Sequence, residues 1–108
     1  MSSMMLEQTL TDRGILVDKE GFLQEPAQWT EALGEEIAAS AGITMTPRHW
    51  DVVKFMRNTY LESGSAPTIR TLGAKSGVAV KELYQLFPKG PAKLAAKIGG
   101  IPKPKGCI

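Results

Sequence analysis

The residue with the clearest capacity for chemistry is a cysteine one position from the end of the sequence. Cys107 is the only cysteine of the 108-residue chain, and only Ile108 follows it. Such a thiol is accessible to other molecules because little chain lies beyond it to bury it. Lys103 and Lys105 precede it, and nearby positive charge favours the nucleophilic thiolate over the thiol. The pattern favours a reactive thiolate, and an inert terminal cysteine is the alternative.

The segment that carries this thiol, here called the C-terminal arm, comprises residues 101–108 and reads Ile-Pro-Lys-Pro-Lys-Gly-Cys-Ile. Its two prolines exclude a helix and favour an extended backbone. At about 3.1 Å per residue, the arm would carry the sulfur roughly 19 Å from the element before it. Gly106 gives the backbone freedom to enter a narrow site. We therefore expect a flexible arm with reach.

The composition excludes several other kinds of chemistry. One cysteine and one histidine, His49, cannot supply the roughly four Cys or His ligands of a structural zinc site, and one thiol cannot form an internal redox pair. We therefore expect no metal and no cofactor. The sequence shows no apolar run near the ~20 residues of a membrane span and no secretory signal in residues 1–10. We expect a cytoplasmic protein with no membrane partner, whose thiol is kept reduced.

Charge is distributed unevenly along the chain. Residues 1–69 carry five Lys or Arg against ten Asp or Glu, whereas residues 70–108 carry eight against one. A basic half of this kind suggests an anionic partner, either a nucleic acid or an acidic protein surface, although solubility alone is the other interpretation. Arg70 falls in a predicted first helical turn, and Lys93 follows a loop that leads into a helix N-terminus. Both are candidates for binding an anion or stabilising the arm.

Hydrophobic periodicity predicts a mainly α-helical single domain over residues 1–108. Short apolar runs on either side of an Asp-Lys-Glu-Gly turn at 18–21 predict a small N-terminal β-hairpin, and residues 1–10 are expected to be disordered. Threonine caps, helix-starting prolines and helix-ending glycines then predict five helices. These run from 31 to near Gly42, over about 47–62, and over 69–76, 80–87 and 91–98.

Residues 68–87 have the spacing of a helix-turn-helix unit, and this supports a second interpretation. The second helix would present Lys81 and Gln85 to DNA. Few of its side chains can read bases, so a packing unit is favoured over a DNA-binding regulator.

The ending Gly-Ile-Pro-Lys-Pro-x-x-Cys-Ile, within the run from 86 to 108, resembles the C-terminus of the DsrC/TusE family. Agreement extends to Asp-Lys-Glu-Gly-Phe-Leu at 18–23, to Trp29, to His-Trp at 49–50 and to Ala-Pro-Thr-Ile-Arg at 66–70. The resemblance covers about residues 13–108. It implies a mostly helical orthogonal bundle with an N-terminal hairpin and a mobile C-terminal arm. It also implies that Cys107 carries a persulfide.

The family has two branches, and the resemblance implies different partners for each. TusE-like members take sulfur from the TusBCD complex and pass it to the thiouridylase that makes 2-thiouridine at the tRNA wobble position. DsrC-like members are accessory gamma subunits of dissimilatory sulfite reductase or related sulfur-oxidation systems. They use a second cysteine, eleven residues upstream of the penultimate one, which is Ala96 here. We therefore favour a TusE-like sulfurtransferase-type carrier, a protein co-substrate rather than a turnover enzyme.

Overall fold

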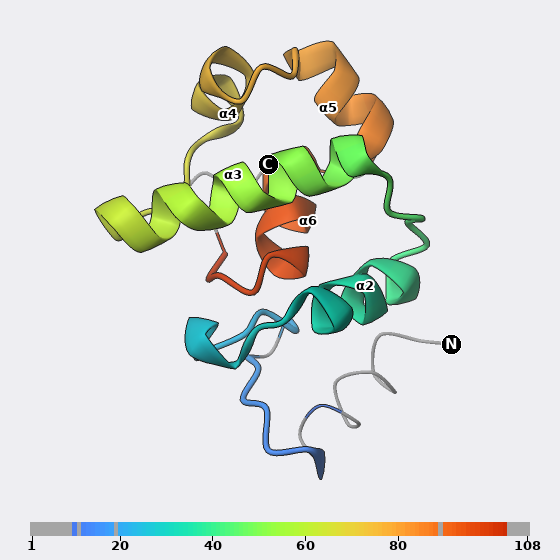
Figure 1. The fold of residues 1–108 in the computed structure, drawn as a ribbon, viewed down its shortest axis with the longest axis vertical. Helices are drawn as coiled ribbons and strands as arrows, with labels where there is room; N and C mark the ends of the chain where they lie inside the picture. The colour runs from blue at the N-terminus through green and yellow to red at the C-terminus, as the bar shows by residue number, and fades with distance from the viewer. Residues whose placement is uncertain (1–9, 11, 19, 89, 104–108) are drawn as a thin grey trace.

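The computed structural model describes residues 10, 12–18, 20–88 and 90–103, and its described elements are helical (Figure 1). This agrees with the predicted mainly α class. The described residues form no β-strand. No helix among them is long and apolar enough to cross a membrane. In chain order the elements are the 3₁₀-helix η1 (Pro26–Gln28) and the α-helices α2 (Glu31–Ser40), α3 (Pro47–Ser63), α4 (Ile69–Lys75), α5 (Val80–Leu86) and α6 (Pro91–Ile98).

Threonine side chains set the first residues of three helices. The hydroxyl of Thr30 accepts a hydrogen bond from the backbone N–H of Leu33 at 3.1 Å, and that of Thr68 accepts one from Thr71 at 3.2 Å. Thr46 caps α3 in the same way. Each cap satisfies a backbone donor that has no partner inside the helix. The predicted helix boundaries therefore hold to within one or two residues.

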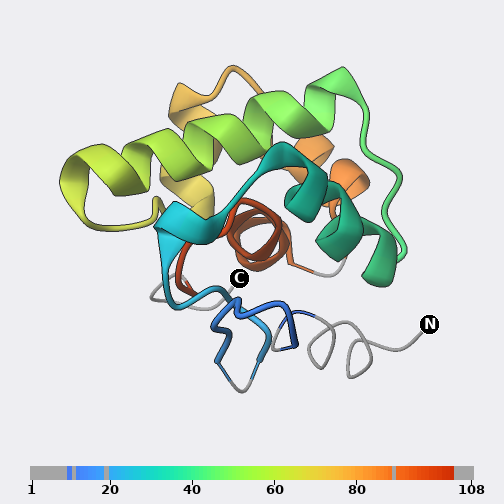
Figure 2. The same ribbon diagram turned by 60° about the horizontal axis from the view of Figure 1, so that its bottom comes forward.

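Helix α6 lies at the centre of the bundle. Figure 2 shows it almost end-on, with α3 passing over it and α2 beside it, and α4 and α5 also contact it. Small residues make this approach possible. Ala92 and Ala95 are buried on α6, and a Cβ at Gly34 of α2 would lie only 3.0 Å from the Ile98 carbonyl oxygen. The last helix of the chain is thus the one most surrounded by the others.

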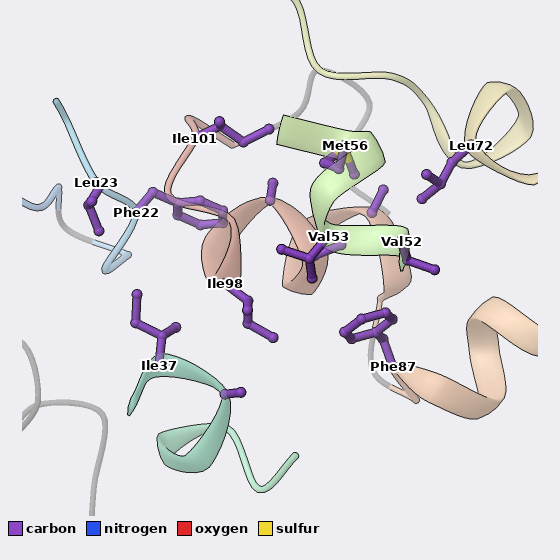
Figure 3. Packing of buried hydrophobic residues seen from close by; sticks show 14 of the residues in the cluster. Phe22, Leu23, Ile37, Val52, Val53, Met56, Leu72, Phe87, Ile98 and Ile101 are labelled. Atoms are coloured by element: carbon purple, nitrogen blue, oxygen red, sulfur yellow. The ribbon is translucent and has the colours of Figure 1, made fainter. Parts of the chain in front are cut away.

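A single cluster of buried apolar side chains surrounds α6 (Figure 3). It joins the N-terminal segment to every helix from α2 to α6. Fully burying one such side chain stabilises the fold by about 1.5–3 kcal/mol. The largest fully buried side chains are Phe22, Phe87, Leu10, Leu23, Ile37, Met56, Leu72, Leu83, Ile98, Ile101, Val52 and Val53. Ile101 belongs to the predicted arm, so the arm begins inside the core.

The predicted N-terminal hairpin is present as a tight turn with a single antiparallel bridge, between Val17 and Leu23. The carboxylate of Asp18 accepts hydrogen bonds from the N–H groups of Glu20 at 2.9 Å and Phe22 at 3.0 Å. Because a side chain satisfies these donors, the turn holds without a longer ladder. Of the ten residues expected to be disordered, Leu10 is described and buried, and residues 1–9 lie outside the described residues.

Helices α4 and α5 form the predicted helix-turn-helix-like pair. A Cβ at Gly73 would lie 2.5 Å from a methyl group of Val80, so glycine permits their close approach. Arg48 of α3 holds this pair to the bundle. Its Nε lies 2.7 Å and its Nη2 3.0 Å from the two carboxylate oxygens of Glu82. This hydrogen bonding and charge lower the pKa of Glu82 and raise the pKa of Arg48.

Candidate functional site at the root of the C-terminal arm

The arm leaves the bundle from the end of α6, through residues 99–103, which we call the arm root. Gly100 has φ +68°, and its N–H donates to the Lys97 carbonyl at 3.3 Å. The N–H of Ile101 donates to the Ala96 carbonyl at 3.1 Å. These two bonds and the left-handed glycine make a Schellman motif, which satisfies the last carbonyls of a helix and turns the chain. The chain direction is therefore defined where the arm begins.

Two side chains hold the carbonyl groups next to this turn. The indole Nε1 of Trp29 donates to the Ile98 carbonyl at 2.7 Å. The guanidinium of Arg57, on α3, donates through Nη1 to the Gly99 carbonyl and through Nη2 to the Pro26 carbonyl, each at 2.9 Å. Its Cζ also lies 4.5 Å from the centre of the Trp29 ring, a cation–π contact. The end of α6 is thus bound by groups from two other parts of the chain.

The electrostatic environment of Arg57 suits this position. Burial lowers its pKa, yet an arginine keeps its charge in proteins. A cation beside the last carbonyls of a helix complements the negative end of the helix dipole. Trp50 adds an edge-to-face contact with Trp29 at 6.4 Å between ring centres. The guanidinium is therefore held in one place by two hydrogen bonds and an aromatic ring.

A groove of about 270 Å³ borders the arm root at Pro102 and Lys103. It lies between the end of α3, the loop that follows it, and the root itself. Lys103, at its edge, forms an ion pair with Glu20, with Nζ 3.0 Å from Oε2. The N-terminal turn is thereby tied to the last described residue of the chain. The groove is lined by Tyr60, Gly64, Ser65, Ala66, Thr68, Pro102 and Lys103.

The structure describes some of the predicted site residues and not others. Cys107, Lys105 and Gly106 lie outside the described residues, so their predicted roles stay predictions. Lys103 lies at the arm root. Ala96, the position of the second family cysteine, is fully buried in α6.

The other predicted cations are distributed over the bundle. Arg70 is exposed in the first turn of α4, and Lys93 is half-buried in α6. Neither contributes to the lining of the groove that Lys103 borders. On α5, Lys81 and Gln85 are both exposed, as a DNA-facing role would need, and DNA recognition stays a prediction.

His49 has a structural role in this fold. Its Nδ1 accepts from the backbone N–H of Thr46 at 3.2 Å, and its Nε2 then donates to the Leu86 carbonyl at 3.0 Å. The ring also packs edge-on against Phe87, with 5.2 Å between centres. Both ring nitrogens are therefore engaged within the bundle. In the part of the chain that is described, no group of three His, Cys, Asp or Glu side chains is placed to hold a metal ion.

Sequence reasoning did not identify Arg57 or Trp29 as part of the site. From the sequence, Trp29 stood out only as one of the positions that agree with the DsrC/TusE family. The available signal was an arginine within the apolar stripe of the 47–62 helix, between Met56 and Tyr60. A charge at such a position calls for a partner, because an unpaired buried charge is costly. The partners, two backbone carbonyls, have no sequence signature.

The sequence and the fold of this chain are both similar to those of known proteins. The family model described as "DsrC like protein" matches residues 9–108. The sulfurtransferase TusE of Escherichia coli K12 is 48% identical over 102 residues, covering 87% of this chain and 93% of TusE. The NMR structure of Allochromatium vinosum DsrC has a TM-score of 0.76 at 38% identity, covering 87% of this chain and 90% of that one. The oxidized gamma-subunit of dissimilatory sulfite reductase (DsrC) from Archaeoglobus fulgidus has a TM-score of 0.74 at 33% identity, with coverages of 87% and 92%.

Proposed function

This chain belongs to the DsrC family and acts as a sulfur carrier, and we propose that its one thiol, Cys107, holds the sulfur as a persulfide. The observation that carries the proposal is the 48% identity to a sulfurtransferase, TusE, in a chain that has a single cysteine. A carrier that works through a thiol must use that residue. The fixed arm root supports the same assignment, because the sequence beyond it predicts an extended arm that would carry the thiol away from the bundle.

The transfer can be written as thiol–persulfide exchange. The Cys107 thiolate attacks the outer sulfur of a donor persulfide, a new sulfur–sulfur bond forms, and the donor's own sulfur–sulfur bond breaks. The donor leaves as a thiolate, and Cys107 becomes a persulfide. The second transfer repeats the step with an acceptor thiolate and regenerates Cys107. No net oxidation or reduction occurs, so the exchange needs no cofactor.

The residue at position 96 supports a carrier with one thiol. Ala96 is a fully buried methyl group in α6, and no thiol exists there to attack a persulfide on Cys107. Cys107 therefore has no second cysteine in its own chain with which to close a disulfide or trisulfide. The sulfur must leave to a thiol of another molecule. This favours a relay of the TusE type.

We propose that the donor is a TusBCD-like complex and that the acceptor is a thiouridylase working on the wobble position of tRNA. The excess of positive charge in residues 70–108 supports an acidic protein surface or a tRNA-bound enzyme as the partner. We place this relay in the cytoplasm, where a single thiol stays reduced. Lys105 would favour the thiolate of Cys107, and Lys103 less so, because Glu20 already offsets its charge.

Intact-mass measurement tests the carrier role directly. The full chain is incubated with a cysteine desulfurase, L-cysteine and a TusBCD complex, and its mass is measured without reductant. We expect a gain of about 32 Da, one sulfur atom, that dithiothreitol removes. Cys107→Ala should abolish the gain, and a gain that survives in this variant refutes the proposal. Cys107→Ser is the matched control for altered size at this position.

A second candidate function is a role as the accessory gamma subunit of a sulfite reductase. The similarity to the A. fulgidus gamma-subunit favours it, whereas Ala96 lacks the second thiol that DsrC-like members use. Affinity purification from the native organism separates the two. Retention of reductase subunits would favour this candidate, and retention of relay proteins would favour the first.

A further inference from the structure

We infer that Arg57 is a positioning residue for sulfur transfer, which sets the direction in which the arm leaves the bundle. The inference rests on the proposed function of Cys107. It concerns the delivery of the thiol to a protein partner rather than the reactivity of the thiol.

The contacts of Arg57 converge on the arm root. Its two hydrogen bonds join the Gly99 carbonyl, at the end of α6, to the Pro26 carbonyl of η1. The Trp29 ring, 4.5 Å from its Cζ, donates to the Ile98 carbonyl at 2.7 Å. The guanidinium therefore links three segments that are distant in sequence, and it does so beside the last peptide units before the arm.

Close packing at Gly100 connects the direction of the arm to the position of the Trp29 indole. A Cβ at this residue would lie 2.4 Å from Cδ1 of Trp29, so the chain passes directly against the indole. Ile101, which follows, is fully buried. The arm root thus lies between the indole and the core, and the indole in turn contacts the guanidinium of Arg57.

A small change of direction at the root has a large effect at the thiol. The arm sequence favours an extended chain of roughly 19 Å from Ile101 to Cys107. A rotation of about 20° where this chain begins would displace its end by about 6–7 Å. Reacting atoms must approach to about 3–3.5 Å. A misdirected arm would therefore have to find the donor site by chance or by bending.

Stability alone gives a weaker reason for an arginine at this position. Placing a charge in a half-buried site costs desolvation energy, and a well-packed apolar residue of similar volume is often as stable or more stable. An arginine offers a planar fork that can hold two carbonyls at once, whereas a lysine offers a single ammonium group. The geometry of the bridge, rather than charge alone, is thus what Arg57 contributes.

The test compares two sulfur donors on full-length Arg57→Gln and Arg57→Lys variants. Glutathione persulfide is small and needs no directed arm, whereas a persulfide-loaded TusBCD complex is a protein donor. The matched control is Arg13→Gln, which removes a different arginine, one that is paired with Glu36 through an exposed ion pair at 2.8 Å. Circular dichroism sets an assay temperature at which all variants are folded.

We expect both Arg57 variants to accept sulfur from glutathione persulfide within twofold of the wild-type rate. With the protein donor, kcat/KM should fall tenfold or more in Arg57→Gln and by less in Arg57→Lys, while Arg13→Gln stays at the wild-type value. The inference would be overturned if Arg57→Gln slowed sulfur transfer from both donors by the same factor, or slowed it from neither. Failure of the wild-type chain itself to take up sulfur on Cys107 would instead refute the proposed function.

Discussion

Replacing Gly100 with alanine tests whether the arm root is as constrained as its contacts indicate. The residue has φ +68° and completes the Schellman motif that ends α6. Its missing Cβ would lie 2.4, 2.6 and 2.7 Å from three atoms of Trp29, including the Cβ of that residue. An atom next to the backbone cannot rotate away, so either the indole or the chain must move.

Gly42 provides a matched control. It ends α2 in the same motif, with φ +79°, and its N–H and that of Ile43 donate to the Ala39 and Ala38 carbonyls. A Cβ at Gly42 has no atom within 4 Å. Gly42→Ala therefore measures the cost of the left-handed conformation alone, about 1–2 kcal/mol.

Gly100→Ala carries that cost together with the displacement of Trp29. Losing the indole hydrogen bond to Ile98 costs about 1 kcal/mol, and losing the cation–π contact with Arg57 costs about 0.5–2 kcal/mol. We expect a total loss of about 2.5–5 kcal/mol, an excess of about 1.5–3 kcal/mol over Gly42→Ala. A domain of this size has about 5–15 kcal/mol of stability in total.

Urea unfolding followed by far-ultraviolet circular dichroism measures both variants without relying on tryptophan fluorescence. With m of about 1–3 kcal/mol per M, the midpoint of Gly100→Ala should lie roughly 0.5–3 M below that of Gly42→Ala. If the two midpoints agree within about 0.3 M, the contact with Trp29 does not constrain the root and the reasoning fails.

Two further predictions concern the groups that hold α3 to the α4–α5 pair. Beside Arg48, the pKa of Glu82 lies below its ordinary value of 4.5, so the ion pair stabilises the fold above that value and is lost as pH falls through the lowered pKa. Glu82→Gln should therefore lower the Tm at pH 7, and the difference from wild type should shrink as the pH falls below 4.5 and through the lowered pKa; a difference that stays constant as the pH falls contradicts the assignment. His49→Phe leaves the Thr46 N–H and the Leu86 carbonyl without their ring partner. It should cost about 2–4 kcal/mol in urea unfolding, and a cost below about 0.5 kcal/mol would show that these bonds add nothing net.

The helices could be predicted from the sequence because their signals are local. Three helices are capped by a threonine whose side chain accepts a hydrogen bond from the backbone N–H three residues later, namely Thr30, Thr46 and Thr68. Two helices have a proline, Pro47 or Pro91, at the first helical position. Such signals depend on a few neighbouring residues, whatever the rest of the chain does. The predicted bounds of α6, residues 91–98, agree with the structure at both ends.

The site was less accessible from the sequence because its contacts are between distant segments. The thiol and its arm follow from residue types in order, but the bridge from Arg57 to Gly99 and Pro26 depends on how α3 crosses α6. The N-terminal hairpin shows the same limit. Its turn was predicted correctly, yet the extent of pairing depended on the carboxylate of Asp18, which takes up donors near the turn.

Gly100 and Gly106 illustrate how the same residue type can serve opposite needs. Gly100 has lost its freedom, since its left-handed φ is fixed by the Schellman motif and its open side is filled by Trp29. Gly106, next to Cys107, follows two Pro-Lys pairs in the arm, and we expect it to keep the freedom that glycine brings. A carrier that must visit a donor and then an acceptor gains from this order. A fixed origin limits the volume that the thiol must search, and a compliant residue beside the thiol allows the final alignment in two different sites. An arm of the same length with a free root and a rigid end would have a larger volume to search and no means of adjusting the thiol to two different sites.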